Sequence, residues 1–98
     1  MQLARVIGQV VATVKEPGLD TFKILIVQNI DPSAPDGEAS APPYVAVDLV
    51  GAGEGELVTV AQGSAARVPR ATANTPTDSA VVAIVDTLNV DGAVTFEK

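Results

Sequence analysis

The first fifteen residues of the chain alternate between two sets of side chains, and this period of two constrains the fold more than any other feature. Successive side chains of a β-strand point to opposite faces, so the pattern predicts one long strand over residues 2–15. One face carries only small or apolar residues, namely Ala4, Val6, Gly8, Val10, Ala12 and Val14. The other face is mixed and consists of Leu3, Arg5, Ile7, Gln9, Val11, Thr13 and Lys15. Such a strand fits a barrel wall whose outer surface meets another subunit.

Further apolar runs, separated by residues typical of turns, predict more strands. Gly8 suggests a bend or bulge within the first strand. A short helix could begin near Ser64, with that hydroxyl as its N-cap. The expected strands cover residues 22–30, 44–50, 56–61, 80–88 and 93–97, and the strand at 80–88 is expected to be central.

Long polar segments connect these elements. Turns are expected at residues 16–18, 51–55 and 89–92, and exposed loops at 31–43 and 69–79. The loop at 31–43 is interpreted as a connector with almost nothing to bury. Residues 1–98 are therefore predicted to form a single all-β domain, a small OB-like Greek-key β-barrel of five to six strands with at most one short helix. A β-sandwich is the main alternative.

The composition excludes several classes of function. The chain has no Cys and no His, which removes disulfides, thiolate metal ligands and nucleophilic dyads that use His as the base. The net charge of −6 disfavours contact with nucleic-acid phosphates and anionic lipids. Only three aromatic rings are available for base stacking, so single-stranded nucleic-acid binding by an OB-type barrel ranks as the alternative function. No apolar run reaches membrane-spanning length, and the start of the chain is interpreted as a strand and not a signal peptide.

The glycine-rich segment Gly51, Ala52, Gly53, Glu54 and Gly55 invites comparison with nucleotide-binding loops. The dinucleotide motif would need its third glycine at the position of Glu56, followed by a helix, whereas a strand is expected here. Glu54 would also repel phosphate. The structural interpretation is a tight loop whose glycines permit positive φ or close approach of neighbouring backbones.

The remaining polar candidates predict structure in preference to chemistry. Asp48 and Asp86 interrupt apolar strands, and each is interpreted as a strand-end carboxylate that accepts backbone N–H bonds, with a catalytic dyad as the alternative. Ser64 lacks the glycine two positions later that a nucleophile elbow requires. The pairs Glu54 with Glu56, and Asp31 with Asp36, suggest a cation site by spacing alone. We therefore predict no catalytic residue, no cofactor site and no metal site.

The order of these motifs resembles the EutN/CcmL family of microcompartment and carboxysome vertex proteins, nearly from end to end. No single block carries the resemblance, but their combination at these separations is specific. The blocks are residues 5–15, Leu19, residues 25–27, Val47-Asp48, Gly51 to Glu56, Gly63 to Arg67, Pro76-x-Asp78 and Ile84-Val85-Asp86. The loop at 31–43 is somewhat longer and richer in Pro than the usual family version.

The resemblance implies a non-enzymatic shell protein of the bacterial cytoplasm, a homopentamer at the five-fold corners of a polyhedral microcompartment shell. Its implied partners are copies of itself and hexameric and trimeric shell proteins. The loop from Gly51 to Gly55 would border a narrow pore on the central axis, and a further hypothesis directs Glu54 toward that axis. Arg5, Ser64 and Arg67 are the candidate residues for contacts between subunits or with neighbouring tiles.

Overall fold

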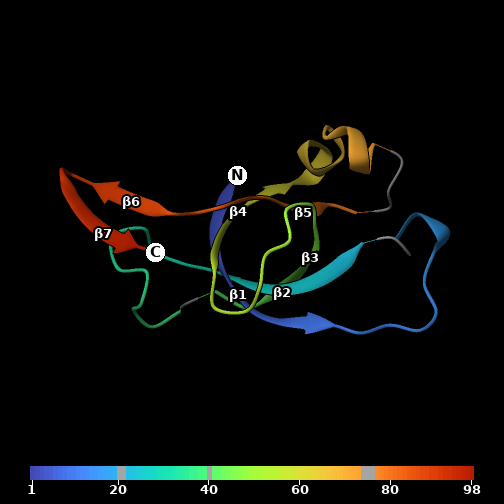
Figure 1. Ribbon diagram of the computed structural model, residues 1–98, viewed down its shortest axis with the longest axis horizontal. Helices are drawn as coiled ribbons and strands as arrows, with labels where there is room; N and C mark the ends of the chain where they lie inside the picture. The colour runs from blue at the N-terminus through green and yellow to red at the C-terminus, as the bar shows by residue number, and fades with distance from the viewer. Residues whose placement is uncertain (20–21, 40, 74–76) are drawn as a thin grey trace.

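A closed five-stranded barrel dominates the computed structural model, which describes residues 1–19, 22–39, 41–73 and 77–98 (Figure 1). The barrel order is β1-β2-β3-β5-β4, and β4 pairs back onto β1. All neighbours are antiparallel except β3 and β5, which run parallel. The prediction of an all-β, OB-like barrel is confirmed. The strands are β1 (Gln2–Val10), β2 (Lys23–Asn29), β3 (Tyr44–Asp48), β4 (Leu57–Gln62) and β5 (Ser79–Ile84).

The barrel interior is filled by the buried face of each strand. Ala4 and Val6 of β1 are 0% and 1% exposed, so the first part of the face predicted to be apolar points inward. The prediction is wrong for its later part, because Val10 and Val14 are 36% and 92% exposed. Burying a Val or Leu side chain contributes roughly 1.5–3 kcal/mol. The core is built from medium-sized side chains, among which the largest fully buried ones are Leu25, Leu57, Val6, Val27, Val58, Val60 and Val81.

β1 is shorter than the predicted strand. Its ladder with β2 ends where Val10 pairs with Ile24, and continuing it to Lys15 would place Leu19 opposite. Leu19 instead belongs to the 3-10 turn η1 (Pro17–Leu19), so the ladder does not extend to Lys15. The predicted irregularity at Gly8 is confirmed, because the register shifts between Val6 and Gly8.

The predicted strand at 80–88 is divided in two. β5 ends at Ile84, and β6 (Thr87–Val90) leaves the barrel to pair with β7 (Ala93–Glu97). The turn between them uses Asp91 and Gly92 with φ of 50° and 79°, the positive values that two-residue hairpin turns require. This hairpin extends one end of the molecule, whose extents are 44 × 24 × 21 Å (Figure 1). Asp86, between the two strands, is exposed rather than buried.

Short 3-10 segments replace the single helix that the sequence suggested. They are η1, η2 (Gly63–Arg67) and η3 (Arg70–Thr72). Ser64 is not the N-cap of η2: Gln62 holds that position without a side-chain capping bond, because the turn starts one residue earlier at Gly63. Buried Ala66 of η2 packs with Val47 and Ala80, in a second apolar cluster separate from the barrel core.

The long loops carry more structure than the sequence suggested. In the loop at 31–43, Pro35 is buried, and the Gln28 side-chain amide donates to the Ala41 carbonyl at 2.8 Å. Ala41 is half-buried, and the other described residues of this loop are exposed. In the loop at 69–79, the hydroxyl of buried Thr72 donates to the Ala66 carbonyl at 2.7 Å. Pro76, a residue of the family resemblance, lies outside the described residues.

Candidate functional site

The glycine-rich segment between β3 and β4 forms a tight loop against the barrel wall. Gly51 and Gly55 have φ of 77° and 88°, values that side-chain-bearing residues rarely adopt. Gly53 has no positive φ, and the two glycines with positive φ have open space where a side chain would begin. Between them, Ala52 is fully buried and belongs to the barrel core. The middle of the loop is therefore fixed, while Gly51 and Gly55 are exposed.

Asp48 organises the first half of this loop. Its carboxylate accepts the backbone N–H of Val50 at 3.1 Å and that of Ala52 at 3.0 Å. The side chain is only 2% exposed. Lys23, opposite Asp48 on β2, donates to the Ala52 carbonyl at 2.7 Å and lies 3.6 Å from the carboxylate. The prediction that Asp48 is a strand-end carboxylate accepting backbone bonds is confirmed.

Glu56 organises the second half. One carboxylate oxygen accepts the Gly53 N–H at 2.8 Å, and the other accepts a hydrogen bond from Lys98 Nζ at 2.7 Å. The bond from Lys98, followed by the one from Gly53, holds the pKa of Glu56 below its ordinary value. The same pairing raises the pKa of Lys98. The end of β7 is thereby tied to the loop.

Arg5 of β1 joins this loop to the one at 31–43. Its guanidinium donates to the Gly55 carbonyl at 2.8 Å and to the Asp36 carboxylate at 2.7 Å. Two backbone bonds reinforce the junction: Gly55 N–H donates to the Val6 carbonyl, and Val6 N–H donates to the Glu56 carbonyl. Arg5 thus contacts the predicted axis loop directly.

Glu54 occupies the exposed tip of the loop. Two other carboxylates of this region have cationic partners, because Glu56 binds Lys98 and Asp36 binds Arg5. Within the described residues, no group of three or more His, Cys, Asp or Glu side chains is arranged to hold a metal ion. Asp48 is committed to backbone bonds, and Asp86 lies in the connection between β5 and β6.

The other two candidate interface residues lie elsewhere, on η2. Ser64 is exposed there. Arg67 donates to the carbonyl of Thr77, ten residues later in the chain, at 2.9 Å. The structure therefore brings Arg5 to the glycine loop and places Ser64 and Arg67 on a different part of the surface. Sequence reasoning missed Lys23 and Lys98, which reach the loop and its anchor Glu56 only through tertiary pairing. It placed Asp36 in a candidate cation pair with Asp31, whereas Asp36 binds Arg5.

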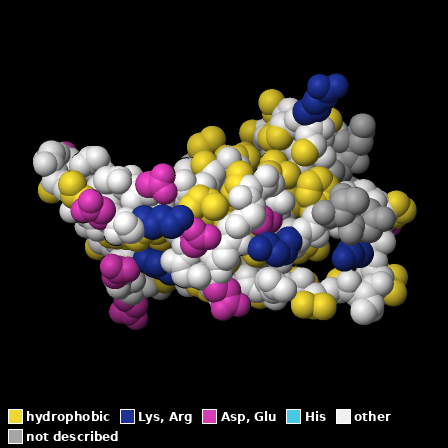
Figure 2. Space-filling view, viewed as in Figure 1, with side chains coloured by type: hydrophobic (Ala, Val, Ile, Leu, Met, Phe, Trp, Pro, Cys, Tyr) yellow, Lys and Arg dark blue, Asp and Glu magenta, His cyan; other side chains and the backbone are white. Residues whose placement is uncertain are grey.

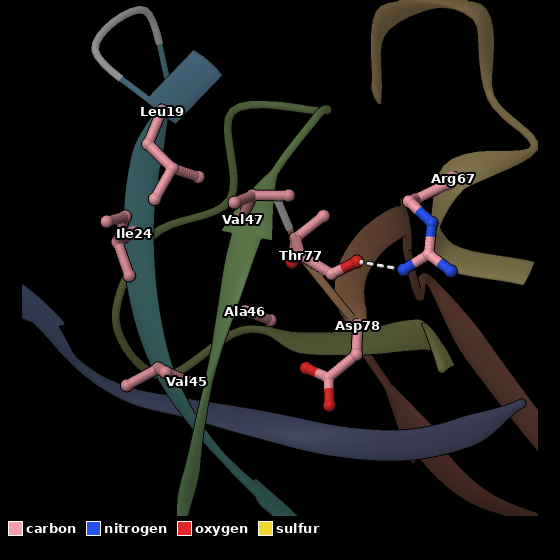
Figure 3. Close-up of a pocket in the computed structure, with 8 residues that line it drawn as sticks. All are labelled: Leu19, Ile24, Val45, Ala46, Val47, Arg67, Thr77 and Asp78. Carbon is pink, nitrogen blue, oxygen red and sulfur yellow. Dashed lines mark hydrogen bonds between the residues drawn. The ribbon is translucent and has the colours of Figure 1, made fainter. Parts of the chain in front are cut away.

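An open groove of about 560 Å³ lies beside Arg67 on the outer face of β2 and β3 (Figure 3). Its apolar side is formed by Leu19, Ile24, Val45 and Val47, and its polar side by Arg67 and Asp78. In Figure 3 the dashed bond joins Arg67 to Thr77, on the opposite side of the groove from Leu19 and Ile24. Val45 is 54% exposed, which is high for an apolar strand residue.

Comparison with known proteins gives the family. Residues 1–86 match the family described as "Ethanolamine utilisation protein EutN/carboxysome". The chain belongs to the EutN/CcmL family.

Curated members of this family are similar over their whole length. The carboxysome shell vertex protein CcmL of Synechococcus elongatus is 44% identical over 98 residues, which cover 100% of this chain and 96% of that protein. The microcompartment shell vertex protein EutN of Escherichia coli K12 is 43% identical, with 100% of both chains covered. PduN of Salmonella typhimurium, also a shell vertex protein, is 50% identical over 93 residues, which cover 91% of this chain and 99% of that protein.

Solved structures of family members share the fold. A carboxysome subunit CcmL is 46% identical with a TM-score of 0.89, covering 100% of this chain and 99% of that one. The pentameric microcompartment shell protein GrpN from Rhodospirillum rubrum is 43% identical with a TM-score of 0.74, covering 92% and 98%. These relatives are structural shell proteins, so the nucleic-acid-binding alternative is not supported. No helix within the described residues has the length and apolar character needed to cross a membrane.

Proposed function

We propose that this chain is the vertex subunit of a bacterial microcompartment shell, assembling as a homopentamer with the Gly51–Gly55 loop around its axis. The observation that carries the proposal is the construction of this loop. Its anchors lie on the barrel side, at Asp48, Ala52 and Glu56, and its exposed residues are Gly51, Glu54 and Gly55. A surface with one side chain between two exposed glycines lets several copies converge closely around one point.

The proposed role needs packing surfaces and no reacting groups. The vertex pentamer would fill the corner left by flat arrays of hexameric and trimeric shell proteins in the bacterial cytoplasm. It would carry no catalytic activity and no cofactor. Support comes from the shell vertex proteins among its relatives. It also comes from Asp48 and Glu56, whose carboxylates are occupied by bonds from backbone N–H groups and from Lys98.

Glu54 gives the proposed axis its chemical character. It stands at the exposed tip of the loop, so five copies would place five carboxylates around one opening. Such a ring would disfavour the passage of anions. Arg5 stabilises the loop around this opening through its hydrogen bond to the Gly55 carbonyl. Ser64 and Arg67 would contact neighbours away from the axis.

Substitution of Gly53 tests the axial position of the loop. A Cβ at Gly53 would meet only the Glu56 carboxylate, at an ordinary contact distance of 3.6 Å, so Gly53→Val should fold as a monomer. Native mass spectrometry should show pentamers for the wild-type chain and a loss of pentamers for the variant. Ala83→Val, at an exposed site on β5, serves as the control for added bulk. Pentamers that tolerate Gly53→Val would remove the loop from the axis, and a wild-type chain that stays monomeric at high concentration would overturn the proposed function.

A further inference from the structure

The β6–β7 hairpin has no partner strand of its own. Within the described part of the chain, β6 and β7 pair with each other and with no strand of the barrel. A two-stranded hairpin is at best marginally stable in water, and it normally needs another strand or an apolar surface against it. Its base is held by two contacts: the Thr95 hydroxyl donates to the Pro32 carbonyl at 2.7 Å, and Lys98 binds Glu56. Val94, beside the tip, is 57% exposed.

The groove on the outer face of β2 and β3 is the complementary feature. It offers Leu19, Ile24, Val45 and Val47 as an apolar floor. Along it, β3 has an open edge, because its pairing with β5 is limited to Val47 and Asp48 in the described residues. Strand edges and exposed apolar side chains are the features by which a further strand is recruited.

The charges of the two features match. Residues 63–73, which contain η2 and η3 beside the groove, include Arg67 and Arg70 and no acidic residue. The hairpin segment 87–97 includes Asp91 and Glu97 and no basic residue. Figure 2 shows acidic side chains mainly over the half of the visible face that carries the hairpin. Asp78 is the one acidic residue of the groove lining and opposes this match locally.

Figure 1 shows the hairpin at one end of the long axis, whereas β2 and β3, whose residues line the groove, lie in the barrel. A hairpin therefore cannot fold back into the groove of its own barrel, whereas the hairpin of a second copy can reach it. We infer that the β6–β7 hairpin of one copy occupies the β2–β3 groove of the next, with Val94 against Val45. Repeated head to tail with the rotation of the proposed pentamer between copies, this contact closes into a ring. The inference rests on the proposed function for the number of copies and adds the surfaces that join them.

Disulfide trapping tests this contact directly, since the chain has no cysteine of its own. A disulfide forms only between Cα atoms within about 7 Å, so the readout is local. The double variant Val45→Cys/Val94→Cys, oxidised mildly, should run as a ladder up to the covalent pentamer on a denaturing gel without reductant. The pair Val14→Cys/Val94→Cys uses a valine outside the groove that is 92% exposed, against 54% for Val45, and should remain monomeric on that gel.

A second variant keeps the test independent of cysteine chemistry. Val94→Asp should raise the dissociation constant of the ring about ten-fold or more, as expected when a buried interface side chain becomes a charge. Val14→Asp should leave the ring intact, and both should melt as wild type when monomeric. The inference is overturned, and the proposed function stands, if the wild-type chain forms pentamers while the double cysteine variant gives no covalent ladder and Val94→Asp leaves the ring intact. A wild-type chain without pentamers would remove both.

Discussion

Lys98 Nζ lies 2.7 Å from Glu56 Oε2, which joins the end of the hairpin strand to a loop 42 residues earlier in the chain. The other oxygen of the same carboxylate accepts the Gly53 N–H. One side chain therefore couples two structures that are otherwise separate, the hairpin and the glycine loop. In the proposed pentamer these are the ring contact and the axis.

This coupling predicts a pH window for hairpin attachment. The pKa of Glu56 is lowered from 4.5. Its contribution to the stability of the folded state is therefore present above pH 4.5 and is lost as pH falls through the lower pKa of the folded state. The pKa of Lys98 is raised from 10.5, so its contribution is present below that value and is lost as pH rises through the higher one. The protection factors of the β6 and β7 amides, which compare their exchange rates with those of an unfolded chain at the same pH, should thus fall at both extremes. Lys98→Met should abolish the change tied to this pair, and an unchanged exchange profile in that variant would refute the coupling.

Asp48→Asn is expected to destabilise the fold. An amide has one acceptor oxygen where the carboxylate has two, so one of the N–H groups of Val50 and Ala52 loses its partner. Leaving a buried donor unsatisfied costs about 1–3 kcal/mol, to be measured as the free energy of unfolding in urea at fixed protein concentration. The exposed Asp86→Asn is the control, with an expected change within about 0.5 kcal/mol. Equal effects for the two variants would remove the anchoring role of Asp48.

Gly51 and Gly53 should respond differently to the same substitution. Gly51→Ala places a Cβ at φ 77° and should cost roughly 1–2 kcal/mol of folding free energy, although nothing nearby clashes. Gly53→Ala has no such strain, and its only contact is at 3.6 Å, so the change should be small. Thermal unfolding of both variants decides the matter. A larger loss for Gly53→Ala than for Gly51→Ala would contradict the backbone geometry described above.

Leu25→Ala probes the thin core. Leu25 is 1% exposed and is among the largest buried side chains of the barrel. Removing it should cost about 2–5 kcal/mol, a large share of the stability of a domain of this size. Val11→Ala, at a site 82% exposed, is the matched apolar truncation and should change the free energy of unfolding by less than about 0.5 kcal/mol. Similar losses from the two truncations would mean that the barrel interior is not the main source of stability.

The features that sequence reasoning predicted correctly are the ones determined locally. The inward face of β1 follows from a two-residue period around Ala4 and Val6, and the bulge follows from Gly8. Asp48 was interpretable because an ionised group that ends an apolar strand must find donors, and the next backbone N–H groups are the nearest.

The features that it missed depend on partners distant in the chain. β1 stops at Val10 because of where β2 begins, and the run at 80–88 divides because β6 pairs with β7 instead of the barrel. Arg5 was a candidate only by resemblance to the family, and nothing local linked it to Asp36 or to the Gly55 carbonyl. The lack of a cap at Ser64 reflects where η2 begins, a difference of one residue that propensity does not resolve.

Ala52 lies in the barrel core next to the exposed Gly51, and this limits the movement of the loop around the proposed opening. A rim whose middle residue is embedded among Val and Leu cannot swing aside without disturbing the barrel. The proposed pore would therefore have a constant diameter. Discrimination among solutes would depend on the chemistry lining that fixed hole, and changing one side chain would retune it without any moving part.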